Sequence, residues 1–344
     1  MSKITQTTKE IKITTAGNVP ETIFSCNEPV ILRGLVKNWP LRNAGLDSDE
    51  AAIDYLKTRY NGKPSIACFG KPEIHGRFFY QDDITALNYQ TVKTTIDDFL
   101  EQVMLNKAKK NPSSFYIASN YIDSHFPNFR ADNDLNLTEH VNNDLLNTPD
   151  IKIWLGNATL ACCHYDTSDN IACCVVGNRQ FTLFPPSQIN NLYPGPLELN
   201  PGGPAISMVN FKKPDFEKHP RFKEAIAHGQ IANLTPGDAL YLPRMWWHQV
   251  EGLSPFNVLV NYWWNKTPKY MGEAMSVLQH ALLSLKDRPM EEKKAWQHVF
   301  NYYIFSDTDH AGAHLPEQAK GALGKIDNIQ ARKLRAQLIH NLNR

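Results

Sequence analysis

The sequence predicts a mainly β fold with helical decorations, in which a sandwich or barrel is followed by C-terminal helices. Between about Phe115 and Trp264, short β-branched and aromatic runs alternate with turn signals such as Gly177-Asn178. From residue 269 onward, the apolar residues instead have helical spacing. The length of 344 residues exceeds the usual size of a single core, so we expect one large β domain with additions or two modest domains.

Composition and charge argue against several classes of protein. The chain has 36 Lys and Arg against 35 Asp and Glu, so its net charge of +1 does not predict a broad polyanion-binding surface or a nucleic-acid partner. No apolar run approaches the roughly 20 residues of a membrane helix, and the N-terminal stretch lacks the apolar core of a secretory signal. We therefore expect a protein that is neither secreted nor membrane-bound.

The six cysteines fit neither a zinc site nor a disulfide framework. Two adjacent pairs, Cys162-Cys163 and Cys173-Cys174, lack the spacing of zinc ligands and lie in strand-like apolar runs. Cysteine in such a run behaves as a small apolar residue. The sequence therefore predicts buried, reduced thiols and a cytoplasmic location.

The N-terminal region predicts an α/β elaboration of the β domain. Short strands are expected at Glu10 to Thr14 and at Pro29 to Gly34, and a charged helix at about Asp49 to Tyr60. The run Thr95 to Asp98 has the pattern of a capping box and is followed by apolar residues at helical spacing, which predicts a second helix.

Two segments are expected to shape a substrate-binding mouth. Residues Tyr193 to Gln230 are rich in proline and charge, as is typical of a long insertion over one end of a β structure. The aromatic and acidic run Phe78 to Asp83, with Phe69-Gly70 before it, is expected beside that insertion. These segments suit an extended peptide or a small molecule, and the aromatic residues alternatively belong to the core.

The C-terminal helices carry three apolar stripes, which predict packing on the β core or pairing with a second copy. The stripes are Met271, Ala274, Met275, Leu278, Leu282 and Leu285; Trp296, Val299, Phe300 and Tyr303; and Ile329, Leu334, Leu338 and Ile339. We expect a catalytic domain over residues 1–268, a helical dimerisation region over residues 269–344, and a homodimer.

The motif His164-Tyr165-Asp166 predicts part of a metal site. In a strand, residues i and i+2 point the same way, so His164 and Asp166 would project together. His248, in the run Pro243-Arg244-Met245-Trp246-Trp247-His248, is the natural third ligand. Two histidines and one carboxylate on one face of an octahedral ion leave three positions open, which suits Fe(II) with a chelating cosubstrate and O₂. Taken singly, each histidine is equally consistent with a structural role.

Four further residues are candidates for binding a dicarboxylate cosubstrate such as 2-oxoglutarate. Arg179 would share a face with apolar neighbours, where its charge requires an anion, although an exposed hairpin arginine is the alternative. Asn170 follows the motif, and Asn261 lies in a strongly apolar strand, where it needs a partner in the site or in the backbone. Tyr116 is the fourth candidate, through its phenol.

In combination these motifs resemble the JmjC-type cupin oxygenases, and especially the cupin-like branch around the asparaginyl hydroxylase that acts on hypoxia-inducible factor. The resemblance covers about Pro29 to Trp264 and is weaker in the C-terminal helices. It implies a double-stranded β-helix (a jelly roll) in which Fe(II) is held by the catalytic residues His164, Asp166 and His248. Members of this family hydroxylate protein side chains or modified tRNA bases, and some demethylate.

The resemblance also implies a cosubstrate site and an assembly. The distal carboxylate of 2-oxoglutarate would be held by Tyr116 and Arg179, and the metal-chelating end would be flanked by Asn170 and Asn261. The helical C-terminus resembles the dimerisation element of the family. The expected substrate is a peptide, protein or small molecule.

Two positions depart from the asparaginyl hydroxylase pattern. Arg179 stands where that relative has a lysine, and Ala161 stands where it has a threonine, so one hydroxyl is missing unless Thr159 or Thr182 replaces it. A cupin isomerase and a non-catalytic ligand-binding cupin are the competing readings. The isomerase pattern has histidine rather than aspartate at the position of Asp166, which disfavours it.

Overall fold

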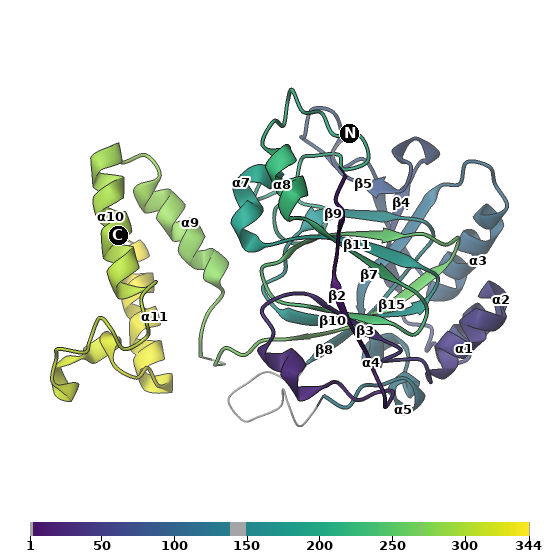
Figure 1. Ribbon diagram of the computed structural model, residues 1–344, viewed down its shortest axis with the longest axis horizontal. Coiled ribbons are helices and arrows are strands. Elements are labelled where there is room, and N and C mark those ends of the chain that lie inside the picture. Colours follow the sequence, from purple (N-terminus) through teal and green to yellow (C-terminus); the bar gives the residue numbers. More distant parts are fainter. Residues whose placement is uncertain (1–2, 138–148, 269, 344) are drawn as a thin grey trace. The chain divides into compact units, whose positions relative to one another are not determined.

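The computed structural model describes residues 3–137, 149–268 and 270–343 (Figure 1). The chain divides into two compact units, Met1–Asn265 and Lys266–Arg344. The predicted boundary falls at residues 268 and 269, and the second of these lies outside the described residues. In the described part of the chain, no helix combines the length and the apolar character that crossing a membrane requires.

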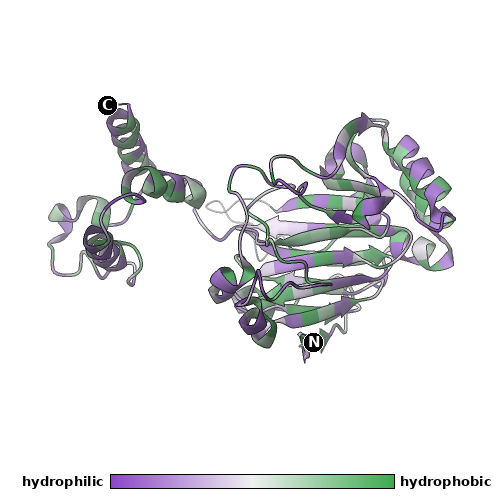
Figure 2. Cartoon of the chain, turned by 90° about the horizontal axis from the view of Figure 1, so that it is seen from above, coloured by the Kyte–Doolittle hydropathy of each residue, from purple (hydrophilic) through white to green (hydrophobic). Residues whose placement is uncertain are grey.

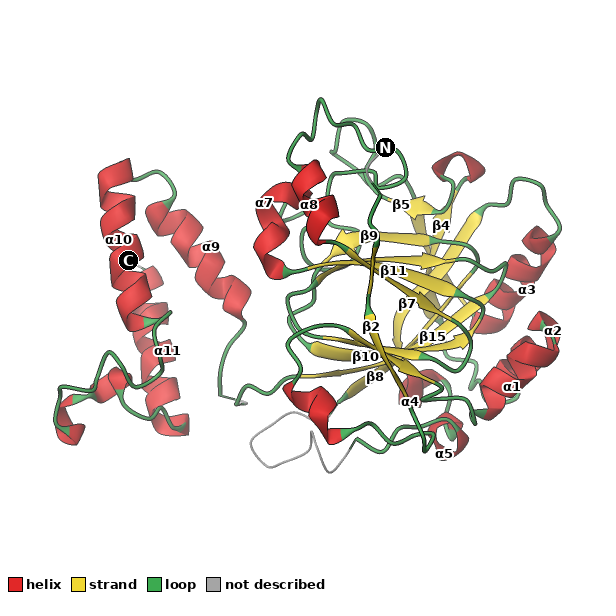
Figure 3. Ribbon diagram, in the orientation of Figure 1, coloured by secondary structure: helices red, strands yellow, loops and turns green. Residues whose placement is uncertain are grey.

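The first unit is built on two sheets. The smaller has the strand order β1 (Gln6–Thr7), β12 (Gln230–Leu234), β11 (Arg179–Phe184), β14 (Trp247–Gly252), β9 (Leu160–His164) and β5 (Arg77–Phe78). The larger has the order β2 (Lys9–Lys12), β3 (Val30–Arg33), β13 (Ala239–Leu242), β10 (Asp169–Val176), β15 (Asn257–Trp264), β8 (Asp150–Gly156), β7 (Ser114–Tyr121), β4 (Ser65–Gly70) and β6 (Gln90–Thr94). Figure 3 shows these strands.

The two sheets share an inner core. Apolar side chains from both sheets form one cluster: Ile31, Ala172, Cys174, Phe181, Leu183, Ala232, Leu234, Leu240, Leu242, Trp246 and Leu259. Strand alternation explains their origin, because Phe181 and Leu183 lie two residues apart on β11 and face the same way. The two-sheet arrangement with helical additions confirms the predicted mainly β, jelly-roll class of fold.

Strand β10 is buried on both of its faces, which explains its unusual composition. Ala172 and Cys174 point into the inner core, whereas Ile171, Cys173 and Val175 belong to the cluster on the outer face of the larger sheet. A strand covered on both sides reads as a continuous apolar run rather than as an alternating one. Figure 2 shows the more usual alternation of hydrophobic and hydrophilic residues along other strands.

The outer face of the larger sheet is covered by helices. These are α1 (Pro40–Asp47), α2 (Asp49–Lys57), α3 (Ile96–Lys107), α4 (Ile122–His125) and α5 (Phe129–Asp132), with a 3₁₀ turn η1 (Glu21–Ser25). The N-cap of the predicted capping box is confirmed at the start of α3, where the Asp98 backbone N–H donates to Thr95 Oγ1 over 3.1 Å and the Thr95 hydroxyl donates to the Asp98 carboxylate. The bond from the backbone satisfies one of the free N–H groups of the first turn.

The chain between β11 and β12, which includes the predicted insertion, covers the outer face of the smaller sheet. It contains α7 (Ile189–Leu192), just before the insertion, and α8 (Phe222–His228), which pack on each other, and η3 (Pro186–Gln188) precedes them. Phe222 and Ile226 of α8 form a cluster with Phe184 of β11 and Trp247 of β14. The chain between β11 and β12 is therefore anchored against the strands that carry the candidate site.

The second unit is helical, as the apolar stripes predict. It contains α9 (Ala274–Leu285), α10 (Met290–Tyr303) and α11 (Asn328–Leu342), with short 3₁₀ turns η4 (Glu317–Ala319) and η5 (Gly321–Leu323). A groove of about 900 Å³ between α9 and α10 is lined by apolar residues that include Leu278, Leu282 and Trp296. None of the residues of α9 or α10 is buried within the chain.

Candidate metal centre

His164 and His248 lie directly opposite each other on neighbouring antiparallel strands. His164 is the last residue of β9 and pairs in register with His248, the second residue of β14. Their ring centroids are 4.3 Å apart. The sheet register thus brings together two residues that are 84 positions apart in the sequence.

Each imidazole is oriented by the carbonyl of the residue two positions earlier in the chain. Nδ1 of His164 donates to the Cys162 carbonyl over 2.8 Å, and Nδ1 of His248 donates to the Trp246 carbonyl over 3.0 Å. With the proton on Nδ1, each ring presents the lone pair of Nε2. This is the arrangement in which a histidine ligates a metal while its other nitrogen fixes the ring.

Asp166 completes the group from a loop rather than from a strand. β9 ends at His164, and the Asp166 carbonyl accepts a hydrogen bond from the Met245 N–H over 2.7 Å. Its carboxylate nevertheless points at the histidines, because Oδ2 lies 3.5 Å from Nε2 of His248. Ligand atoms of His164, Asp166 and His248 all lie within 4.8 Å of one another, close enough to share one ion.

Burial keeps His248 in the form that binds metals. The residue is only 3% exposed. Burial, the largest cause, and the nearby His164 together lower its pKa to about 4, whereas Asp166 and the Trp246 carbonyl act in the opposite sense. His248 is therefore neutral at physiological pH, as ligation requires. Two histidines and a carboxylate form the donor set that suits Fe(II).

Two loops that carry the candidate ligands are joined by an ion pair. The Arg244 backbone N–H donates to Asp169 Oδ1 over 3.1 Å, and its guanidinium donates to Asp169 Oδ2 over 2.9 Å. The next residue after Arg244, Met245, adopts a left-handed backbone with φ of 67°, which is energetically costly for a residue with a side chain. This conformation aims the Met245 N–H at the Asp166 carbonyl, so the loop before His248 also positions Asp166.

The predicted cosubstrate residues surround the same group. One small cavity is lined by His164, Asp166 and His248 together with Tyr116, Asn170, Arg179 and Asn261. The remaining lining residues are aromatic or apolar and are Trp154, Ala161, Ala172, Phe181, Val250, Leu259 and Trp263. The structure therefore brings all seven candidate residues into one site.

Arg179 is a buried cation in need of an anion. It is 5% exposed, and its Nε has no hydrogen-bond partner. Among the described residues, no carboxylate lies within 4.0 Å of its guanidinium. A buried unpaired charge is costly, and a carboxylate from a bound molecule would relieve that cost. Burial also raises the pKa of Tyr116 to about 12, with the charge of Arg179 opposing it, so this phenol stays protonated and able to donate.

The two asparagines offer polar groups at the walls of the cavity. Oδ1 of Asn170 is buried and has no partner. Oδ1 of Asn261 accepts from the Trp154 indole N–H over 2.8 Å, which orients the amide of Asn261. A polar, anionic ligand requires a cation and free hydrogen-bonding groups, and the cavity offers both in Arg179 and Asn170. The residues present therefore fit 2-oxoglutarate.

The hydroxyl missing at Ala161 is not restored by its neighbours. Ala161 lines the cavity, but neither Thr159 nor Thr182 does. Thr182 faces away because it alternates with Phe181, which points inward. One side of the cavity therefore has a methyl group where the asparaginyl hydroxylase pattern has a hydroxyl.

A chamber of about 360 Å³ adjoins the cavity and shares the walls formed by Tyr116, Trp154 and Trp263. Its outer side is formed by Phe78 and by residues 201–204 and 206 of the insertion. These are the two segments in which the sequence predicts a substrate mouth. Among the described residues that line this chamber, Asp166 is the only one with a carboxylate.

Sequence reasoning missed several residues of the site. Trp154 forms a cavity wall and holds Asn261, while Asp169, Arg244 and Met245 fix the ligand-bearing loops. The sequence offers only their positions as a signal. Asp169 directly precedes the candidate Asn170, and Arg244 follows the strand β13 and precedes His248. Their pairing depends on strand register, which the sequence does not display.

Comparisons with known proteins agree with this architecture. The cupin-like domain family matches residues 16–270, close to three quarters of the chain. The chain is 26% identical over 267 residues to HSPB1-associated protein 1 of Bos taurus, covering 74% of this chain and 52% of that protein. It is 28% identical over 246 residues to Jumonji C domain-containing protein 5 of Drosophila melanogaster, covering 70% and 55% respectively.

A further relative has a demethylase name. Lysine-specific demethylase JMJ31 of Arabidopsis thaliana is 25% identical over 357 aligned positions, covering 93% of this chain and 60% of that protein. The chain thus spans about half the length of the curated relatives it matches. The resemblance to JmjC-type cupin proteins is confirmed at the level of the family, and the asparaginyl hydroxylase branch remains a prediction. The fold, the site and the family match together show that the chain belongs to the cupin-like domain family.

Proposed function

We propose that this protein is an Fe(II)- and 2-oxoglutarate-dependent oxygenase that hydroxylates a protein side chain or a small molecule. The observation that carries the proposal is the unpaired, buried Arg179 in the cavity that also holds the His164, Asp166 and His248 group. A metal site alone is consistent with many activities. A metal site with a buried guanidinium that lacks a carboxylate favours a dicarboxylate cosubstrate.

Each residue has a role under this proposal. His164 and His248 would bind Fe(II) through Nε2, and Asp166 through its carboxylate. Arg179 would pair with the distal carboxylate of 2-oxoglutarate, and the protonated Tyr116 would donate to it. When bound, Fe(II) and 2-oxoglutarate supply O₂ activation, in which the keto acid is decarboxylated to succinate and one oxygen atom enters a substrate C–H bond.

The walls of the cavity support this chemistry by excluding water. Phe181, Val250 and Leu259 surround the polar groups, which makes electrostatic contacts to a bound anion stronger than they would be in water. Asn170 and Asn261 would hold the chelating end of the cosubstrate. The remaining opening toward the adjoining chamber is the route for the substrate.

The chamber favours hydroxylation of an uncharged group over demethylation of a lysine. Apart from Asp166, which the metal would engage, its lining residues include no carboxylate that could pair with an ammonium group. Its walls are instead aromatic and apolar, with Phe78, Trp154 and Trp263 among them. An apolar pocket accepts an uncharged side chain at lower desolvation cost than a cation.

Two further proposals concern assembly and location. The exposed apolar faces of α9 and α10 would be covered by a second copy of the chain, which gives a homodimer. All six cysteines are unpaired, and four of them are buried, which supports a reducing, cytoplasmic environment.

Succinate formation tests the proposed activity. The protein reconstituted with Fe(II) is expected to convert 2-oxoglutarate to succinate slowly without substrate, and His164→Ala should abolish this turnover. His125 is a suitable control, because it is also buried with its Nδ1 bonded to a carbonyl but lies outside the cavity. Succinate formation that is absent in the wild type, or equal in His164→Ala, contradicts the proposal.

A further inference from the structure

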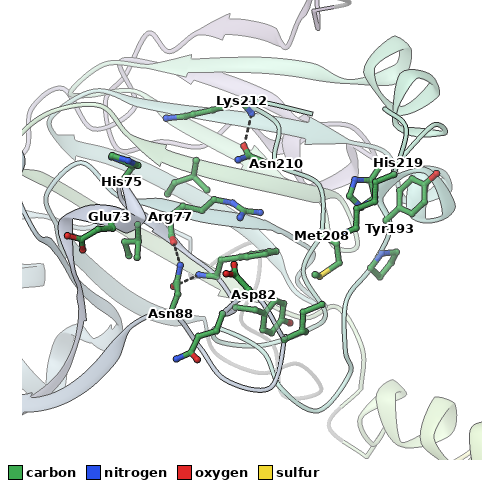
Figure 4. A pocket seen from close by; sticks show the side chains of 18 of the residues that line it. Glu73, His75, Arg77, Asp82, Asn88, Tyr193, Met208, Asn210, Lys212 and His219 are labelled. Carbon is green, nitrogen blue, oxygen red and sulfur yellow. Dashed lines mark hydrogen bonds between the residues drawn. The ribbon is translucent and has the colours of Figure 1, made fainter. Parts of the chain in front are cut away.

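A groove of about 950 Å³ (Figure 4) lies beside the chamber, because neighbouring residues of the same chain segments line the two spaces. Leu160 lines the groove, whereas the next two residues, Ala161 and Cys162, line the chamber. In the insertion, Met208 lines the groove and Ile206 lines the chamber. The groove and the chamber therefore lie within a few residues of each other along both β9 and the insertion.

The two walls of the groove differ in charge. The wall from the insertion contributes Lys212, Lys218 and Arg221 and has no carboxylate among its lining residues. The wall from the N-terminal segment contributes Arg77 together with Glu73 and Asp82. Lys212 is already paired with Glu251, so the cations that stay available are Arg77, Lys218 and Arg221.

Two of these cations lie over aromatic rings. The guanidinium carbon of Arg77 lies 3.5 Å from the centroid of the Phe79 ring, and that of Arg221 lies 4.5 Å from the centroid of Tyr193. Arg221 is fixed further by a 3.0 Å bond from its Nε to the Asn190 carbonyl. Within the described ranges, no carboxylate lies within 4.0 Å of either guanidinium. Arg77 also contacts the Cys162 thiol. A guanidinium has five N–H donors, so each of the two arginines keeps donors beyond these contacts that can bind a carboxylate.

Backbone strain is concentrated along this groove. His75, Ile84 and Tyr193 line it and have positive φ angles of 48°, 59° and 50°. Such conformations cost about 1–3 kcal/mol each for residues with side chains and cluster at binding sites.

The strained residue Tyr193 positions Arg221. Its hydroxyl accepts the Arg221 backbone N–H over 3.0 Å, while its ring supports the Arg221 guanidinium. The same ring packs edge-on against His219, with the centroids 4.8 Å apart. His219 is 8% exposed, and its Nδ1 has no partner. Figure 4 shows Arg77 reaching toward the side of the groove where Tyr193 and His219 lie.

We propose that this groove binds a mixed-charge segment of the polypeptide substrate, with an acidic side chain held between Arg77 and Arg221. This inference rests on the proposed function, because it places the segment beside the residue that enters the chamber. Glu73 and Asp82, on the same wall as Arg77, would pair with a basic side chain of the same segment. They would repel the continuous phosphate backbone of a nucleic acid, which is why the groove favours a polypeptide.

Selection from a library of random 12-residue peptides, displayed on phage and panned against the full-length chain, tests this inference. The enriched peptides should carry Asp or Glu, and fluorescence anisotropy should show about tenfold weaker binding to the double variant Arg77→Gln/Arg221→Gln. The double variant Arg77→Lys/Arg221→Lys should retain part of the affinity. Replacing the Asp or Glu of the peptide with Asn or Gln should weaken binding to the wild-type chain by the same factor. This test leaves the protein unchanged.

Two controls separate the possible failures. Arg59 is also stacked on a tyrosine, with 3.7 Å between its guanidinium carbon and the Tyr55 centroid, but lies outside the groove, so Arg59→Gln should not alter binding. His164→Ala should bind the peptides normally, because the groove needs no metal. Enriched peptides without acidic residues, binding that survives Arg77→Gln/Arg221→Gln, or equal loss in Arg59→Gln overturn the inference. Normal peptide binding in a chain that binds no Fe(II) refutes the proposed activity instead.

Discussion

His164 and His248 face each other across β9 and β14 with 4.3 Å between their ring centroids, and each ring is turned by a carbonyl two residues earlier in its own chain segment. The same short-range contact thus sets the ring orientation and the tautomer on both strands. Because the strands are paired in register, the distance between the two Nε2 atoms is set by the sheet and not by flexible loops. A metal site built in this way is largely formed before the metal arrives.

The metal-free protein should lose stability as the pH falls from 7.5 to 5.0. The pKa of His248 is lowered to about 4 in the folded chain, against about 6.5 when unfolded, so the unfolded state takes up the proton first. The loss is complete only below pH 4 and amounts to about 2 kcal/mol in the free energy of unfolding at pH 5.0. Urea unfolding measures this, and His248→Asn should show a smaller pH dependence. If the free energy of unfolding changes equally with pH in the wild type and in His248→Asn, the prediction is wrong.

Replacing Arg179 should separate stability from cosubstrate binding. Arg179→Met removes a buried, unpaired charge, so the free energy of unfolding should stay the same or rise, while the affinity for 2-oxoglutarate falls about 10- to 100-fold. Arg33 provides the opposite case, because it is paired with Glu10 and Asp238. Arg33→Met should destabilise the chain and leave cosubstrate affinity unchanged. Isothermal titration and urea unfolding measure the two quantities, and a strong loss of stability in Arg179→Met would contradict this role.

The ion pair between Arg244 and Asp169 should act on metal affinity. Arg244→Gln and Asp169→Asn each remove the charged bond between the Arg244 guanidinium and Asp169 Oδ2, which ties the loop before His248 to the start of β10, and we expect about tenfold weaker Fe(II) binding for either variant. The double variant should be little worse than each single one, because both break the same contact. Anaerobic titration with Fe(II) measures the affinity, and the unfolding temperature of the metal-free chain serves as the control. If the Fe(II) affinity is unchanged while the unfolding temperature falls, the ion pair only stabilises the fold and the prediction is wrong.

The apolar faces of the second unit should hold two copies together. Leu278→Asp combined with Leu282→Asp places charges in the groove between α9 and α10, so the mass from light scattering should fall from twice 39.1 kDa to 39.1 kDa. Leu105 is an exposed leucine of α3 in the first unit, and Leu105→Asp is the matched control that should leave the mass unchanged. A monomeric wild type would refute the homodimer.

Much of the site was predictable because it depends on strand periodicity. The two-residue spacing alone predicts that Arg179 shares a face with Phe181 and Leu183. In the structure, Arg179 and Phe181 both line the cavity. Asp166 shows where periodicity fails. The sequence predicts it on the strand of His164, but its carbonyl bonds to Met245 in a loop, and β9 has already ended.

Contacts that depend on register could not be predicted. Trp154 meets Asn261 because β8 and β15 pair with Trp154 opposite Leu259, two residues before the asparagine. A shift of that register by one residue would turn Trp154 to the other face of the sheet. The groove beside the chamber is a similar case, because Arg77 and Arg221 come from segments that are 144 positions apart.

Equilibrium binding of Fe(II), measured anaerobically with and without 2-oxoglutarate, tests the central claim most directly. The account predicts one Fe(II) per chain, tighter binding when 2-oxoglutarate is present, and loss of both effects in His164→Ala but not in His125→Ala. Binding that is indifferent to 2-oxoglutarate, or that survives in His164→Ala, would contradict it.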